Sequence, residues 1–152
     1  MGLLQWAPIA HHALRPVTHP HATMEAIRAY AFVNVFVAHA ADGDLADEEL
    51  DVIRRNVHRL GRGLAFPAKD IEAALHQAME TYWQLLSLGE SEVVARFRTE
   101  TRTLALTFQR DPRLVHAIRE DLMEVAGADG EVLAMETFLI DAMAKRWKEA
   151  QA

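Results

Sequence analysis

A short acidic turn occurs twice in this chain, with Asp42 and Asp129 lying 87 residues apart. Residues 41–45 read Ala-Asp-Gly-Asp-Leu, and residues 128–132 read Ala-Asp-Gly-Glu-Val. Each copy lies where one apolar helical pattern ends and another begins. Glycine after aspartate lets the backbone turn with a positive φ angle. The pair therefore predicts two related helix–(Asp-Gly turn)–helix units in one fold.

The spacing of the apolar residues predicts an all-α fold. No run alternates with period two, and apolar residues recur every three or four positions. The 152 residues suit one domain with a substantial core. We expect a compact bundle of six to seven helices, six of which can be placed at about 23–37, 46–60, 67–88, 91–108, 112–125 and 133–148.

The chain divides into an arm and a helical domain. Residues 1–22 carry three of the five prolines and four of the eight histidines without any periodic pattern, which predicts a loosely structured N-terminal arm. Its histidines could form a genuine transition-metal site. In the alternative interpretation they bind metal only adventitiously, as any histidine-rich tail does. The helical domain is expected over residues 23–150.

Local signals predict several details of the helices. Thr23 and Ser91 are expected as N-caps, and Gly61 with Gly63 is expected to end the second helix. The first helix is apolar all round, which predicts a central, buried position. Asn34 within it would then need a facing polar partner.

The acidic turns resemble half of a calcium loop. If Asp42 were the fifth position of an EF-hand, Gly43 and Glu49 would fall on its glycine and its bidentate glutamate. The first and third positions would then be Ala38 and Ala40, which have no side-chain oxygen. A genuine EF-hand is therefore excluded.

A weaker, partly hydrated divalent-cation site, for calcium or magnesium, stays open at these turns. Residues 42–53 contain six acids and no base, and residues 120–144 contain seven acids and no base. Crowded carboxylates suit such ions. The predicted ligands are Asp42, Asp44, Glu49, Asp129, Glu131 and Glu136. In the alternative interpretation, Glu49 and Glu136 only cap the helices that follow.

Other function classes find less support. The net charge of −6 and the absence of cysteine argue against nucleic-acid binding and thiol chemistry. No zinc-protease, phosphate-loop or nucleophile-elbow motif occurs, and His39 is expected to be a capping or surface residue rather than a general base. The longest apolar run is too short to span a bilayer, so we expect a cytoplasmic protein without a transmembrane segment.

The stretch Ala-Ala-Asp-Gly-Asp-Leu-Ala-Asp-Glu-Glu-Leu and its echo Ala-Asp-Gly-Glu-Val-Leu-Ala-Met-Glu resemble the TerB-like family, named for a tellurite-resistance protein. The resemblance covers roughly residues 23–150. It implies a bacterial, compact all-helical domain associated with tellurite and other stress responses. It also implies metal ions at an acidic surface, protein contacts near the inner membrane and no defining enzymatic activity. The chain departs from the family pattern at Ala46, Ala134 and Met135.

Two functions follow from these observations. The first is a non-enzymatic interaction domain whose acidic side binds a divalent cation or a basic protein partner, and whose basic face includes Arg96, Arg98, Arg102 and Arg110. The second is an enzyme or small-molecule binder with a polar pocket in the bundle, lined by Asn34, by Tyr30 or Tyr82, and by a buried histidine.

Overall fold

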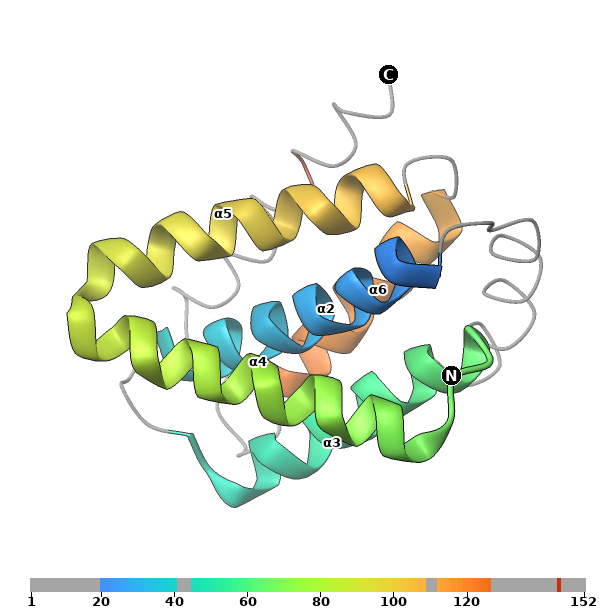
Figure 1. Ribbon diagram of the computed structural model, residues 1–152, viewed down its shortest axis with the longest axis horizontal. Helices are drawn as coiled ribbons and strands as arrows, with labels where there is room; N and C mark the ends of the chain where they lie inside the picture. The colour runs from blue at the N-terminus through green and yellow to red at the C-terminus, as the bar shows by residue number, and fades with distance from the viewer. Residues whose placement is uncertain (1–19, 41–44, 109–111, 127–144, 146–152) are drawn as a thin grey trace.

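The computed structural model describes residues 20–40, 45–108, 112–126 and 145 of the chain. These residues form five helices (Figure 1): α2 (Pro20–Ala40), α3 (Asp47–Gly63), α4 (Ala68–Leu88), α5 (Glu90–Thr107) and α6 (Pro112–Ala126). No strand occurs among them, which confirms the predicted all-α class. Five helices are fewer than the six to seven expected. The helix expected from about residue 133 and the second Asp-Gly turn lie outside the described residues, so the internal repeat stays a prediction.

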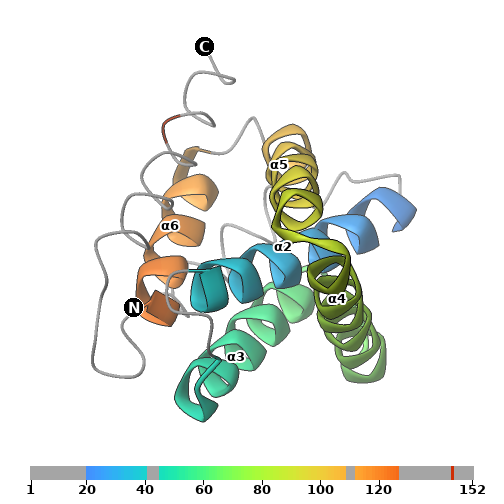
Figure 2. The same cartoon turned by 90° about the vertical axis from the view of Figure 1, so that its left-hand side faces the viewer.

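Helix α2 is the centre of the bundle, as its sequence predicts. It packs against each of the other four helices, and Figure 2 shows it surrounded by them. Every residue from 26 to 39 is buried except Arg28. A helix that is apolar all round is stable in water only when other elements cover it on every side. No helix of the described ranges is long and apolar enough to cross a membrane.

Aromatic contacts fix α2 against its two longest neighbours. The rings of Phe36 and Phe97 stack with their centroids 4.0 Å apart, which joins α2 to α5. Phe32 lies 5.5 Å from Tyr82, at an interplanar angle of 58°, and joins α2 to α4. The antiparallel hairpin of α4 and α5 therefore closes over one side of α2 (Figure 1).

Helix α2 begins at Pro20, three residues before the expected N-cap. Proline is favoured at the first helical position because its missing N–H would have no partner there. Thr23 is therefore inside the helix, and the prediction that it caps the helix is wrong. The last three residues assigned to the N-terminal arm belong to α2.

The end of α3 differs from the expected glycine cap. Gly61 and Gly63 are both helical, and the left-handed residue is Ala65, with a φ of 66°. The N–H of Phe66 donates to the carbonyl of Gly61 at 3.0 Å, and that of Ala65 to Arg62 at 2.9 Å. These bonds form a Schellman motif. The absence of a side chain at Gly61 instead allows close packing, since a Cβ there would lie 2.5 Å from Cγ1 of Ile71 on α4.

A single residue, Gly89, joins α4 to α5. Its φ of 139° and ψ of 156° lie in a region that only glycine adopts without strain. The predicted stop at Gly89 is confirmed. Because α5 begins at Glu90, the prediction that Ser91 caps it is wrong. The arginines predicted on the outer face of α5 are exposed where the structure describes them, at Arg96, Arg98 and Arg102; Arg110 lies outside the described residues.

Candidate functional site

Helix α3 follows the first acidic turn and begins with several carboxylates, of which one is buried and the others are exposed. Glu49 is 2% exposed, and its Oε1 accepts a hydrogen bond of 2.9 Å from the backbone N–H of Ala46. This is the glutamate half of a capping box. Ala46 has no side-chain oxygen, so the reciprocal half is missing. The carboxylate of Glu49 is thus already engaged in capping α3.

The other five predicted ion ligands lie outside the described residues: Asp42, Asp44, Asp129, Glu131 and Glu136. Within the described ranges no group of three or more histidine, aspartate or glutamate side chains is arranged to hold a metal ion. Whether the two turns come together is not part of the described structure. The calcium or magnesium site therefore stays a prediction.

Three further carboxylates of the α3 start point outward. Asp47, Glu48 and Asp51 are all exposed; we call these three residues the α3 acidic edge. No ion pair within the described part of the chain neutralises them. The unpaired N–H groups of the helix start favour negative charge, which explains how three acids are accommodated so close to Glu49. The α3 acidic edge nevertheless presents concentrated negative charge to the solvent.

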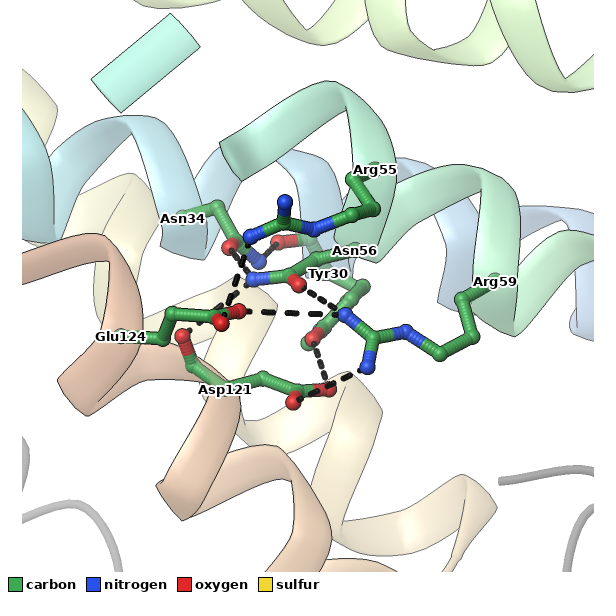
Figure 3. Close-up of polar contacts among 7 residues, drawn as sticks. All are labelled: Tyr30, Asn34, Arg55, Asn56, Arg59, Asp121 and Glu124. Atoms are coloured by element: carbon green, nitrogen blue, oxygen red, sulfur yellow. Dashed lines mark hydrogen bonds and ion pairs between the residues drawn. The ribbon is translucent and has the colours of Figure 1, made fainter. Parts of the chain in front are cut away.

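A cluster of polar side chains joins α2, α3 and α6 inside the fold (Figure 3). We call it the buried polar cluster; it consists of Tyr30, Asn34, Asn56, Arg59 and Asp121. All except Arg59 are at most 3% exposed, and the Arg59 side chain is 9% exposed. Because unpaired polar groups are costly inside a protein, the contacts within this cluster decide whether it is structural or chemically available.

The neutral members of the cluster are bonded to one another. The amide of Asn34 donates to the carbonyl of Tyr30 at 2.7 Å. The amide of Asn56 donates to Oδ1 of Asn34 at 3.4 Å and to the carbonyl of Asp121 at 3.2 Å. The predicted need of Asn34 for a facing polar partner is thus confirmed, and the partner is Asn56.

The charged members face each other. Nη1 of Arg59 lies 3.9 Å from Oδ1 of Asp121, and Nη2 donates to Oδ1 of Asn56 at 2.5 Å. At the surface, Arg55 pairs with Glu124 at 3.2 Å. Asp121 and Glu124, two of the seven acids counted in residues 120–144, therefore both have basic partners on α3. No described group accepts a hydrogen bond from Nε of Arg59.

Burial and the neighbouring carboxylate keep Tyr30 protonated. Its hydroxyl donates to Oδ2 of Asp121 at 3.1 Å. Burial, then the charge of Asp121, raises the pKa of Tyr30 well above its ordinary value. A tyrosine with a raised pKa is a poor base and a weak acid at neutral pH. The cluster therefore braces three helices through contacts among its own groups.

A second polar contact lies on the opposite side of α2. His39 is 8% exposed, and its Nδ1 lies 2.7 Å from the hydroxyl of Tyr82 on α4. The expectation of a capping or surface histidine is therefore wrong; tertiary packing buries His39 between α2 and α4. Burial raises the pKa of Tyr82 to about 12, so the hydroxyl is protonated at neutral pH. His39 also meets the ring of Trp83 edge-on, at a centroid distance of 5.0 Å.

A surface pair connects α3 to α4. His58 contacts the carboxylate of Glu72, and Arg54 lies 3.2 Å from the same oxygen. The hydrogen bond from His58, followed by the charge of Arg54, lowers the pKa of Glu72 despite some burial. No role was predicted for His58. The signal was its position four residues after Arg54, on one face of α3.

A groove lies between α4 and α5 over α2, away from the buried polar cluster. Its volume is about 730 Å³, within the range of small-molecule sites. Phe32 and Ala78 line it, and polar groups surround them: Glu25, Arg28, Gln77, Glu80, Thr81, Gln84, Arg96, Thr99, Glu100 and Thr103. Arg96 is paired with Glu100 at 2.9 Å. None of the residues expected to line a polar pocket lines this groove: Asn34, Tyr30, Tyr82 and the buried histidine, His39, all lie elsewhere.

No protein-family model, curated protein or solved structure matches this chain. The TerB-like resemblance therefore rests on the residues of the two turns alone.

Proposed function

We propose that this chain is a non-enzymatic interaction domain of the TerB-like kind, whose α3 acidic edge binds a basic protein partner. One observation carries the proposal: Asp47, Glu48 and Asp51 are exposed without a neutralising partner among the described residues, while Glu49 is buried. Exposed like charges that no internal pair neutralises attract partners of opposite sign. The family resemblance supports a cytoplasmic role in stress responses such as tellurite exposure, through protein contacts near the inner membrane.

A divalent cation is the weaker occupant of this surface. Glu49 would be the bidentate ligand of an EF-hand-like site, but its carboxylate already accepts the N–H of Ala46. An ion at the turn would compete with the helix cap and would be held loosely through water. A calorimetric titration with calcium and with magnesium should give at best millimolar binding. Sub-micromolar binding that Asp42→Ala plus Asp129→Ala abolishes would establish an ion site instead.

The protein-partner proposal can be tested with heptalysine as a basic probe. The variant Asp47→Asn/Glu48→Gln/Asp51→Asn removes the α3 acidic edge. A matched control, Glu25→Gln/Glu80→Gln/Glu120→Gln, removes three exposed acids elsewhere and changes the net charge equally. We expect the first variant to weaken binding at low salt by about fivefold or more, and the control to weaken it by less than about twofold. Equal effects would mean that only the net charge matters.

The groove between α4 and α5 favours a second candidate function, binding of a small polar molecule. Threonine hydroxyls, glutamine amides and charges of both signs line it, which suits a zwitterionic or hydroxyl-rich ligand. Screening by ligand-observed NMR against amino acids and sugars tests it. A hit whose binding is lost in Thr99→Val/Gln84→Leu would support this function, and a uniformly negative screen would count against it.

A further inference from the structure

The acidic residues of this chain are not spread evenly, and two long segments contain no lysine or arginine. Residues 29–53 carry six acids and residues 70–95 carry five. The first segment includes the end of α2 and the start of α3, and the second includes nearly all of α4 and the start of α5. Neither the stretch that joins α2 to α3 nor the stretch that joins α4 to α5 therefore contains a lysine or arginine.

The fold brings the ends of these two segments to one end of the bundle. The C-terminus of α2, the N-terminus of α3 and the α4–α5 turn all lie on the left-hand side of Figure 1. Figure 2 looks onto this end and shows the three facing the viewer together. Glu90 and Glu92, both exposed at the start of α5, therefore extend the negative charge of the α3 acidic edge.

The same end exposes large apolar side chains. The described residues contain four such exposed side chains, and three lie within residues 83–94: Trp83 is 42% exposed, Leu88 73% and Val94 38%. The fourth, Leu106, is at the far end of α5. All three lie within two helical turns of Gly89, the residue that joins α4 to α5, and exposed apolar side chains near one another mark surfaces that bind partners.

Packing holds Trp83 in position. The rings of His39 and Tyr82 contact it edge-on, with centroids 5.0 and 5.4 Å away, and the contact between Tyr82 and His39 joins those two rings to each other. A tryptophan fixed in this way loses little conformational entropy on binding. Tryptophan is also among the residues that most often dominate the energy of an interface.

We infer that this end of the bundle binds a basic amphipathic helix of a partner protein. The inference rests on the proposed function and extends it from the α3 acidic edge to a surface centred on Trp83. An apolar stripe on the partner helix would pack on Trp83, Leu88 and Val94. Its lysine or arginine residues would face the surrounding acids: Asp47, Glu48, Glu90 and Glu92. A basic occupant fits best, because these four acids are exposed and neither segment contains a lysine or arginine.

The test uses two labelled probes, a helical leucine–lysine peptide of about four turns and heptalysine, whose binding is followed by fluorescence anisotropy. We expect Trp83→Ala and Leu88→Ser/Val94→Ser each to weaken binding of the amphipathic peptide about tenfold or more, and to change heptalysine binding less than about twofold. Glu90→Gln/Glu92→Gln should weaken both probes. The control Leu106→Ala should change neither, and circular dichroism establishes that each variant is folded.

The outcomes separate the inference from the proposed function. If Trp83→Ala and Leu88→Ser/Val94→Ser weaken the amphipathic peptide no more than Leu106→Ala, the inference is wrong, even when loss of the α3 acidic edge still weakens heptalysine. If the Trp83→Ala and Leu88→Ser/Val94→Ser variants weaken binding but removal of the α3 acidic edge does not, the proposed function assigns binding to the wrong surface. Concentration-dependent self-association in sedimentation that Trp83→Ala abolishes would assign the surface to a second copy of this chain and overturn the inference.

Discussion

The hydroxyl of Tyr30 on α2 lies 3.1 Å from a carboxylate oxygen of Asp121 on α6, although 91 residues separate them in the chain. Both residues are almost fully buried. Their contact ties the central helix to the last described helix through a polar bond rather than through apolar packing alone. Such bonds are costly to break one partner at a time, because the remaining group stays buried without a partner.

The first prediction concerns this contact. Asp121→Ala leaves the buried Arg59 with only the exposed carboxylate of Glu124, 3.9 Å away, and we expect it to lower the free energy of unfolding by about 3 kcal/mol. Tyr30→Phe should cost about 1–2 kcal/mol. Urea unfolding followed by circular dichroism measures both. The double variant should cost less than the sum, and strict additivity would contradict the contact. Glu120→Gln, at an exposed neighbour of Asp121, should cost less than about 0.5 kcal/mol.

The second prediction uses the fact that Tyr30 and Tyr82 are the only tyrosines. The pKa of both is raised in the fold, that of Tyr82 to about 12. We expect little tyrosinate absorbance from the folded chain at about pH 11, whereas the chain in guanidinium should titrate near about pH 10. The unfolded state alone loses these protons above about pH 10, so stability should fall from there upward. A tyrosine that titrates normally in the folded chain would contradict its burial.

The third prediction concerns the crossing of α3 and α4 at Gly61. Alanine is the better helix former by about 1 kcal/mol, but its Cβ would lie 2.5 Å from Ile71. Overpacking of this kind costs about 1–3 kcal/mol, so the clash should outweigh the propensity. We expect Gly61→Ala to lower the melting temperature. An unchanged or higher melting temperature would mean that the helices separate at little cost.

The fourth prediction has the opposite sign. Ala65 holds a left-handed conformation at the end of α3, with a φ of 66°, and this costs a residue with a Cβ about 1–2 kcal/mol. Ala65→Gly should therefore raise the free energy of unfolding by up to about 1 kcal/mol. Gly89→Ala should lower it, because its φ of 139° is strained for alanine even though nothing lies within 4 Å of the added Cβ. Calorimetric melting of both variants should show a higher melting temperature for Ala65→Gly and a lower one for Gly89→Ala.

The helices could be predicted because their signals are local. The aspartate–proline pair before α6 places its start at Pro112, as the structure has it, and the uninterrupted apolar pattern of α2 predicts its central position. At the end of α3 the local signal was overridden by tertiary packing. Gly61 and Gly63 resemble a helix end, but tertiary packing against Ile71 uses one of them inside the helix.

The buried polar cluster could not be predicted, because its members come from three helices and no spacing relates them. Asp121 was only counted among the seven acids of residues 120–144, since nothing in the sequence shows that Arg59 faces it. The apolar pattern around Asn34 predicted that it needs a polar partner, but it did not identify that partner as Asn56. The α3 acidic edge was partly predictable: the run of acids indicates the charge, whereas only the structure separates buried Glu49 from exposed Asp47, Glu48 and Asp51.

The central claim, that the α3 acidic edge is the partner-binding surface, is tested most directly by mapping amide chemical shifts of the isotope-labelled chain during a titration with heptalysine. We predict that the largest changes fall on residues 45–51 and that they disappear at high salt, where exposed charges are screened. The groove residues Glu25 and Glu80 should change little. Changes that are equal at all exposed acids, or that are largest away from α3, would contradict the claim.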